Sequence, residues 1–156
     1  MNAVASFSAA LRERSSAAHT SSECTDFMVD LITGTGTRDD YIAHVVQHWF
    51  IYEALEAGTA LLRDHPVVSV FLSDKLTRLP AIAADLEFLI GPDWRERIAP
   101  LPTTQAYVSR IRHLASQWPG GFVAHHYTRY LGDLSGGPSI GRVLQRRFGF
   151  ETNGIG

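Results

Sequence analysis

The feature that most constrains the fold is a glycine-rich stretch near the C-terminal end, residues 127–137, with the sequence YTRYLGDLSGG. Apolar residues at helical spacing flank it on both sides, so we expect a helix there. Glycines stand at 132, 136, 137 and 141, and each interior glycine costs a helix about 1 kcal/mol relative to alanine. A helix that keeps four such residues must gain something from a surface without side chains.

Gly132 and Gly136 are four residues apart and therefore share one helix face, with Arg129 and Asp133 beside them. A face without side chains lets a flat or bulky ligand touch the backbone directly. The same spacing also fits two simpler arrangements. The glycines can admit a neighbouring helix at close range, and Arg129 and Asp133 can form an ordinary i,i+4 pair worth a few tenths of a kcal/mol. Spacing alone favours close helix packing.

Composition indicates one globular domain over residues 1–156, because 45% of the residues are hydrophobic and 19% are charged. The net charge of −2 gives no reason to expect nucleic acid or an anionic membrane as a partner. Cys24 is the only cysteine, so no internal disulfide can form, which fits a reducing compartment. The first residues lack a signal-peptide pattern, and no uncharged stretch is long enough for a membrane span. We therefore expect a cytoplasmic protein without a membrane partner.

Periodicity and capping signals predict an all-α fold of five or six helices, with no convincing alternating strand. Ser8 is the expected cap of the first helix, and Thr37-Arg38-Asp39-Asp40 resembles a capping box that opens a long third helix. Pro119-Gly120-Gly121 is expected to break the chain before the glycine-rich helix. The run at 67–72 has no clear type. The expected helices cover approximately residues 8–22, 24–32, 38–63, 80–90, 103–117 and 122–148.

Among the seven histidines, His19 has the most informative surroundings. The small residues near it leave room for a planar ligand, and Glu23, one helical turn later, can accept a hydrogen bond from the ring nitrogen that does not bind metal. Arg12, two turns earlier, can meet an anionic group at the edge of a ligand. The alternative is a surface histidine on a solvated, serine-rich helix, which the residues alone favour.

Two other histidines have metal-ligand spacing. His44 and His48 are four residues apart and could share a zinc ion, but the sequence offers no evident third ligand, so we do not expect a zinc site. His125 and His126 precede the glycine-rich stretch, and we expect solvent or the core as their surroundings.

The glycine-rich stretch resembles the distal-helix signature of the haem oxygenases. Residues 11–23, which contain His19, are similar to the proximal helix of the same family, and Phe27-Met28 follows as it does there. Further similarity runs through Arg38-Asp39, residues 51–56, Asp85-Leu86 with Phe88, Gly91-Pro92 with Trp94, and Val123-Ala124-His125. Because the resemblance covers almost the whole chain in order, it implies an all-α, haem oxygenase-like helical bundle.

The resemblance also implies roles for particular residues. His19 would be the axial ligand to haem iron, and Arg12 would contact a haem propionate. Asp133 would hold a water that delivers a proton to activated oxygen. The haem-contacting set that it implies is Arg12, His19, Glu23, Tyr127, Gly132, Ser135 and Gly136, and the implied catalytic set is Tyr52, Arg129, Gly132 and Asp133.

By the same resemblance, the expected reaction is oxidative cleavage of haem to biliverdin, CO and ferrous iron. Haem b would be both cofactor and substrate, and O2 and electrons from an external donor would be consumed. A ferredoxin- or flavoprotein-type reductase is the expected partner, docked in part by Arg142, Arg146 and Arg147. The alternatives are a protein that binds or stores haem without turnover, and a purely structural helical bundle.

The chain departs from the family pattern in two places. Pro138 stands where glutamine is common, so one backbone donor is lost. The chain also ends at Gly156, where family members continue with further helices, so we expect the domain to be incomplete at its C-terminal end. A fragment, a truncated gene product or a second completing chain would each explain this. We therefore expect this chain to be less stable than a full-length relative, unless it forms a dimer or binds a segment that completes the domain.

Overall fold

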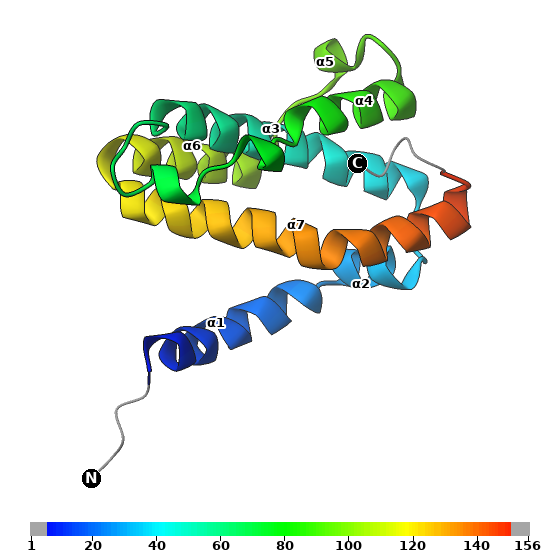
Figure 1. The fold of residues 1–156 in the computed structure, drawn as a ribbon. Coiled ribbons are helices and arrows are strands. Elements are labelled where there is room, and N and C mark those ends of the chain that lie inside the picture. The colour runs from blue at the N-terminus through cyan, green and yellow to red at the C-terminus, as the bar shows by residue number, and fades with distance from the viewer. Residues whose placement is uncertain (1–5, 151–156) are drawn as a thin grey trace.

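The computed structural model describes residues 6–150, apart from the side chain of Glu23 (Figure 1). The described residues form helices and no β-strand, which confirms the all-α prediction. What we expected of residues 1–5 and 151–156 lies outside this part of the chain. The elements are α1 (Phe7–Glu23), α2 (Asp26–Thr33), α3 (Arg38–Leu61), the 3-10 turns η1 (Ser69–Phe71) and η2 (Asp74–Leu76), α4 (Leu79–Ile90), α5 (Trp94–Arg97), α6 (Pro102–Gln117) and α7 (Pro119–Phe148).

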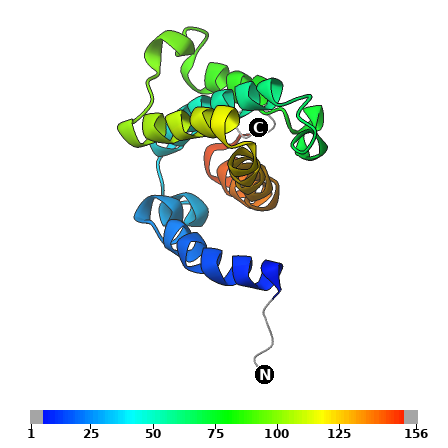
Figure 2. The ribbon, with the colours of Figure 1, turned by 90° about the vertical axis from the view of Figure 1, so that its left-hand side faces the viewer.

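The long helix α7 runs through the middle of the molecule, between two layers (Figures 1 and 2). On one side lie α3, α4 and α6. On the other side lie α1 and α2, and α1 diverges from the rest toward the N-terminus. None of the helices in residues 6–150 combines the length and the apolar composition that crossing a bilayer requires.

The core is centred on α3, which packs against α4, α6 and α7. Tyr52 and Leu55 of α3 are completely buried, as is Phe122 of α7. Gly58 of α3 lies directly against the Phe122 ring, since an added Cβ there would be 2.9 Å from Phe122 Cζ and closer still to Cε2. The missing side chain of Gly58 is therefore what lets α7 approach α3 closely.

The helix starts test the predicted caps. The capping box is confirmed, because the Thr37 backbone N–H donates to Asp40 Oδ2 at 2.9 Å and the Asp40 N–H donates to Thr37 Oγ1 at 3.1 Å. The predicted cap of the first helix is wrong. Ser6 is the N-cap, and its hydroxyl accepts from the Ala9 N–H at 3.3 Å, whereas Ser8 lies inside the first turn.

The predicted break before the glycine-rich helix is also misplaced. The chain turns at Trp118, with φ −148° and ψ 80°, and α7 begins at Pro119 with Gly120 and Gly121 in its first turn. Proline suits the first turn of a helix because it has no N–H to leave unpaired there. An added Cβ at Gly121 would lie 2.6 Å from the Trp118 indole, so this glycine makes room for a ring rather than ending a helix.

Two side chains of α3 also fix the starts of later helices. Glu56 Oε1 accepts from the backbone N–H groups of Arg78 and Leu79, at 2.7 and 3.0 Å, where α4 begins. Gln47 Oε1 accepts from the Leu101 N–H at 2.9 Å, where α6 begins. Both helix starts lack a cap from their own N-cap side chain, so α3 satisfies donors that would otherwise be orphaned.

Replacing Gly58 with alanine should destabilise the protein. The added methyl group would force the buried Phe122 ring to shift, and such overpacking costs about 1–3 kcal/mol. The matched control is Gly141→Ala in α7, where an added Cβ meets no atom within 4 Å and should instead gain up to about 1 kcal/mol of helix propensity. Urea unfolding of both variants measures the difference, and equal free energies of unfolding would contradict the proposed role of Gly58 in the α3–α7 contact.

Candidate functional site

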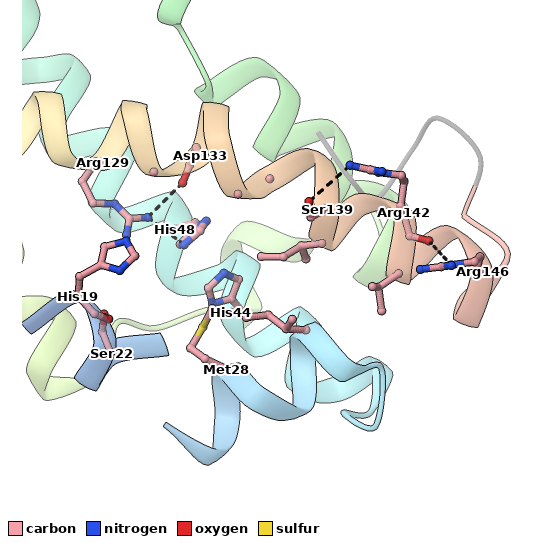
Figure 3. Close-up of a pocket in the computed structure, with 16 residues that line it drawn as sticks. His19, Ser22, Met28, His44, His48, Arg129, Asp133, Ser139, Arg142 and Arg146 are labelled. Atoms are coloured by element: carbon pink, nitrogen blue, oxygen red, sulfur yellow. Dashed lines mark hydrogen bonds and ion pairs between the residues drawn. The ribbon is translucent and has the colours of Figure 1, made fainter. Parts of the chain in front are cut away.

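A pocket of about 720 Å3 lies between α7 on one side and α1, α2 and α3 on the other (Figure 3). His19 lines it from α1, and His44 and His48 line it from α3. The α7 wall extends from Arg129 to Arg146 and includes the glycine-rich stretch. Residues that are far apart in sequence therefore meet around one cavity.

The glycines form the open part of the α7 wall. Gly132, Gly136 and Gly137 line the pocket, and a Cβ added at any of them would meet no atom within 4 Å. Within residues 6–150 no helix packs against this strip, so close helix packing does not account for it. The strip instead presents bare backbone to the cavity, where a ligand can approach it.

His19 lies on the opposite side of the pocket from this strip. Its side chain is exposed, and in Figure 3 it points from α1 toward α7. The Glu23 side chain, which we expected to support the His19 ring, lies outside the described residues. Arg12 is exposed on α1 and does not line the pocket, so the structure does not bring it together with the other predicted residues.

Asp133 is the acidic group of the α7 wall, and a buried tyrosine holds it. The Tyr52 hydroxyl donates a hydrogen bond to Asp133 Oδ2, although the two residues are 81 positions apart. Burial, and then the negative charge of Asp133, raises the pKa of Tyr52 well above its ordinary value. Tyr52 therefore stays protonated and acts only as a donor to this carboxylate.

Arg129 links this carboxylate to the α3 wall. Its Nη2 lies 2.9 Å from His48 Nε2 and 3.9 Å from Asp133 Oδ1. The guanidinium carbon lies 5.7 Å from the Tyr52 ring centroid, and the buried Nε has no hydrogen-bond partner among the described residues. The pair with Asp133 is thus not an isolated i,i+4 pair on a helix surface, because the closer contact of Arg129 is with α3.

His48 belongs to this network, although its spacing from His44 suggests only a shared zinc ion. Its position four residues before Tyr52 places both side chains on one face of α3, and that spacing could have revealed it. Among the described residues, no group of three or more His, Cys, Asp or Glu side chains could hold a metal ion. The His44–His48 pair therefore gains no third ligand there.

Both α3 histidines are neutral in this setting. A guanidinium can only donate, so His48 Nε2 must accept, which places the ring proton on Nδ1. Burial lowers the pKa of His48 well below its ordinary value, and the repulsion that a protonated His44 and the charged Arg129 would exert lowers it further. Burial, followed by the charge of Arg129, lowers the pKa of His44 to about 4. The two rings lie 4.0 Å apart between centroids.

Two further predicted residues lie away from the cavity. The Tyr127 side chain is 60% exposed, and the Ser135 hydroxyl donates back to the Leu131 carbonyl of its own helix. Neither lines the pocket. Of the other histidines, His125 Nδ1 contacts the Tyr107 hydroxyl at 3.1 Å and His126 is buried in the core. The predicted residues that share the pocket are His19, Arg129, Gly132, Asp133 and Gly136, with Tyr52 behind Asp133.

The lowered histidine pKa values predict a loss of stability in mild acid. Between pH 7 and pH 5 the unfolded chain binds protons at His44 and His48 that the folded chain rejects. The free energy of unfolding should therefore decrease as the pH is lowered from 7 to 5, by at most about 1.4 kcal/mol per pH unit for each histidine. Urea titrations across this range should show a shallower slope in the double variant His44→Gln/His48→Gln. The exposed His113→Gln variant is the control, and a double variant with the wild-type slope would contradict the prediction.

Comparisons with known proteins agree with this architecture. The family model described as "Heme oxygenase" matches residues 5–156. The heme oxygenase of Porphyra purpurea is 36% identical over 142 residues, which are 91% of this chain and 60% of that protein. Heme oxygenase 1 of Homo sapiens is 37% identical over 150 residues, which are 96% of this chain and 52% of that protein. The chain thus spans roughly half to 60% of the length of these relatives.

Solved structures show the same likeness. The crystal structure of heme oxygenase-1 from the cyanobacterium Synechocystis sp. PCC6803, in complex with heme, superposes with a TM-score of 0.88 at 34% identity. The match covers 94% of this chain and 66% of that one. The heme oxygenase of Leptospira interrogans gives a TM-score of 0.84 at 32% identity. From its helices, its glycine-lined pocket and these matches, the chain belongs to the haem oxygenase family.

Proposed function

We propose that this protein cleaves haem b oxidatively to biliverdin, CO and ferrous iron, using O2 and electrons from an external donor. One observation carries the proposal. The Asp133 carboxylate, hydrogen-bonded by the buried Tyr52, lines the same pocket as His19, which comes from a helix on the opposite side. A nitrogen ligand and an anchored carboxylate lie on two sides of one cavity. This arrangement suits a flat ligand that is bound through a metal on one face and receives protons on the other.

The pocket residues fit haem. The volume of about 720 Å3 lies within the range of about 300–1,000 Å3 that is usual for ligand and cofactor sites. The strip of Gly132, Gly136 and Gly137 is free of side chains where a flat macrocycle would lie against α7, and added Cβ atoms would fill that space. His19 supplies the imidazole nitrogen that iron prefers as an axial ligand.

Bound haem would supply iron for the binding and reduction of O2, and the protein's own groups would decide the outcome. His19 would hold the iron from the α1 side. The bare backbone at Gly132 and Gly136 would restrict the space above the other face. Asp133 Oδ2 accepts from Tyr52, so its second oxygen is available to accept from a water that faces the pocket. That water would deliver the proton that the reaction consumes.

The electron donor follows from the same proposal, and a ferredoxin- or flavoprotein-type reductase is the partner that we propose. Arg142, Arg146 and Arg147 are exposed near the end of α7, where a basic surface would attract an acidic donor. The Arg147 guanidinium donates to the Thr35 carbonyl at 3.4 Å, whereas Arg142 and Arg146 line the pocket. The cytoplasmic location stays a prediction.

His19→Ala should remove the axial ligand and leave the fold intact, because the exposed imidazole contributes little to packing. The spectrum of the bound haem should therefore change, while the far-UV circular dichroism of the apoprotein should not. The exposed His113→Ala variant on α6 is the matched control and should behave like the wild type. A haem titration that gives the wild-type Soret band for His19→Ala would rule out His19 as the ligand.

Asp133→Ala should bind haem as the wild type does, since this carboxylate is proposed to hold water and not iron. Its rate of biliverdin formation with a reductant in air should fall by about 100-fold or more, the usual contribution of a positioned proton donor. Asp64→Ala, at an exposed site after α3, is the control. Wild-type rates in Asp133→Ala would show that the network is only structural. A wild-type protein that binds haem without forming biliverdin would instead support haem storage.

A further inference from the structure

The Arg129 guanidinium lies between two acceptors, and one of them holds it. Its Nη2 is 2.9 Å from His48 Nε2 but 3.9 Å from Asp133 Oδ1. Hydrogen bonds between a guanidinium and a carboxylate usually span about 2.7–2.9 Å. Arg129 is therefore bonded to the neutral imidazole, although a carboxylate lies one helical turn away on the same helix.

This preference determines which oxygen of Asp133 stays available. Oδ2 accepts from the Tyr52 hydroxyl, so Oδ1 is the oxygen that no group within residues 6–150 holds at close range. The i,i+4 spacing of Arg129 and Asp133 permits a direct pair. If Arg129 moved onto Oδ1, each oxygen would already accept from a protein donor, and a water in the pocket would have to share Oδ1 with a charged group.

We propose that His48 is a positioning residue, which holds the Arg129 guanidinium away from Asp133 and so keeps Oδ1 available for a water in the pocket. The catalytic consequence rests on the proposed function, because the water matters only if Asp133 delivers protons. The restraint on Arg129 does not rest on it, since the contact joins side chains of this chain alone.

The surroundings of His48 suit this role. Its ring packs against His44 at 4.0 Å and meets the edge of the Tyr52 ring at 6.0 Å with an interplanar angle of 74°. These contacts fix the direction of Nε2 toward Arg129. The Arg129 side chain is 25% exposed, so water competes only weakly for the guanidinium. The fixed His48 acceptor and the shielded Arg129 donor therefore favour the hydrogen bond between them.

The first test uses the protein without haem. Crystal structures of the apo His48→Leu and His48→Gln variants are compared with that of the wild type. Leucine removes the acceptor, so the Arg129 Nη2 to Asp133 Oδ1 distance should shorten to about 2.9 Å. Glutamine keeps an acceptor oxygen, so that distance should stay close to its wild-type value. A His48→Leu structure with an unshortened distance would overturn the proposal.

The second test measures turnover. Measured at saturating haem, His48→Leu should form biliverdin about tenfold more slowly than the wild type, and His48→Gln should recover most of that rate. In an Arg129→Leu background the His48→Leu change should have no further effect, because it acts only through Arg129. The exposed His113→Leu variant on α6 controls for an added apolar side chain.

The two tests separate this inference from the proposed function. If the wild type forms biliverdin and His48→Leu matches its rate, or if the double variant is slower than Arg129→Leu alone, the positioning role is wrong. If the wild type forms no biliverdin, the proposed function fails, and the distances in the apo variants alone then decide whether His48 restrains Arg129.

Discussion

The site depends on the hydrogen bond from Tyr52 to Asp133. Tyr52 is completely buried in the packed face of α3, so its hydroxyl has almost no freedom of its own. Through this one bond the rigid core fixes a carboxylate on α7, beside the three glycines of the pocket wall. The contacts of α3 with α4 and α6 thus hold Asp133 in place, even though no residue of α4 or α6 lines the cavity.

The glycine-rich part of α7 is less stable as a helix, but it leaves the pocket wall open to a ligand. Four glycines and Pro138 lie between residues 132 and 141 of α7, and at about 1 kcal/mol for each interior glycine the helix carries a substantial local cost. By contrast, Gly58 and Gly121 lie against aromatic rings, where any side chain would collide. Glycines that serve packing and glycines that leave space open therefore look alike in sequence and differ only in what faces them.

Much of the fold could be predicted, because its signals are local. The Thr37 capping box and the helical periodicity each depend on residues within one or two turns, and the structure has them. The cap at Ser8 and the break after Trp118 were misplaced for a local reason too, since neighbouring serines compete as caps and Pro119 suits a helix start. The fold family came from the resemblance, which no periodicity could supply.

The site was harder to predict, because its contacts join distant residues. The bonds from Tyr52 to Asp133 and from Arg129 to His48 each span 81 positions, and no spacing rule reaches that far. The resemblance placed Tyr52 and Arg129 near Asp133, but it offered no role for His48. It also suggested Arg12, Tyr127 and Ser135, which the structure places outside the pocket.

The chemistry of the acceptor explains why an imidazole suits position 48. A carboxylate there would form a charge-assisted pair with Arg129 and neutralise it beside the pocket. A neutral imidazole accepts the same hydrogen bond and leaves the positive charge in place. Burial, and to a smaller extent that charge, lowers the pKa of both His44 and His48, which keeps the imidazoles neutral and able to accept. The histidines therefore stay neutral beside Arg129, and the positive charge stays near Asp133 without bonding to its second oxygen.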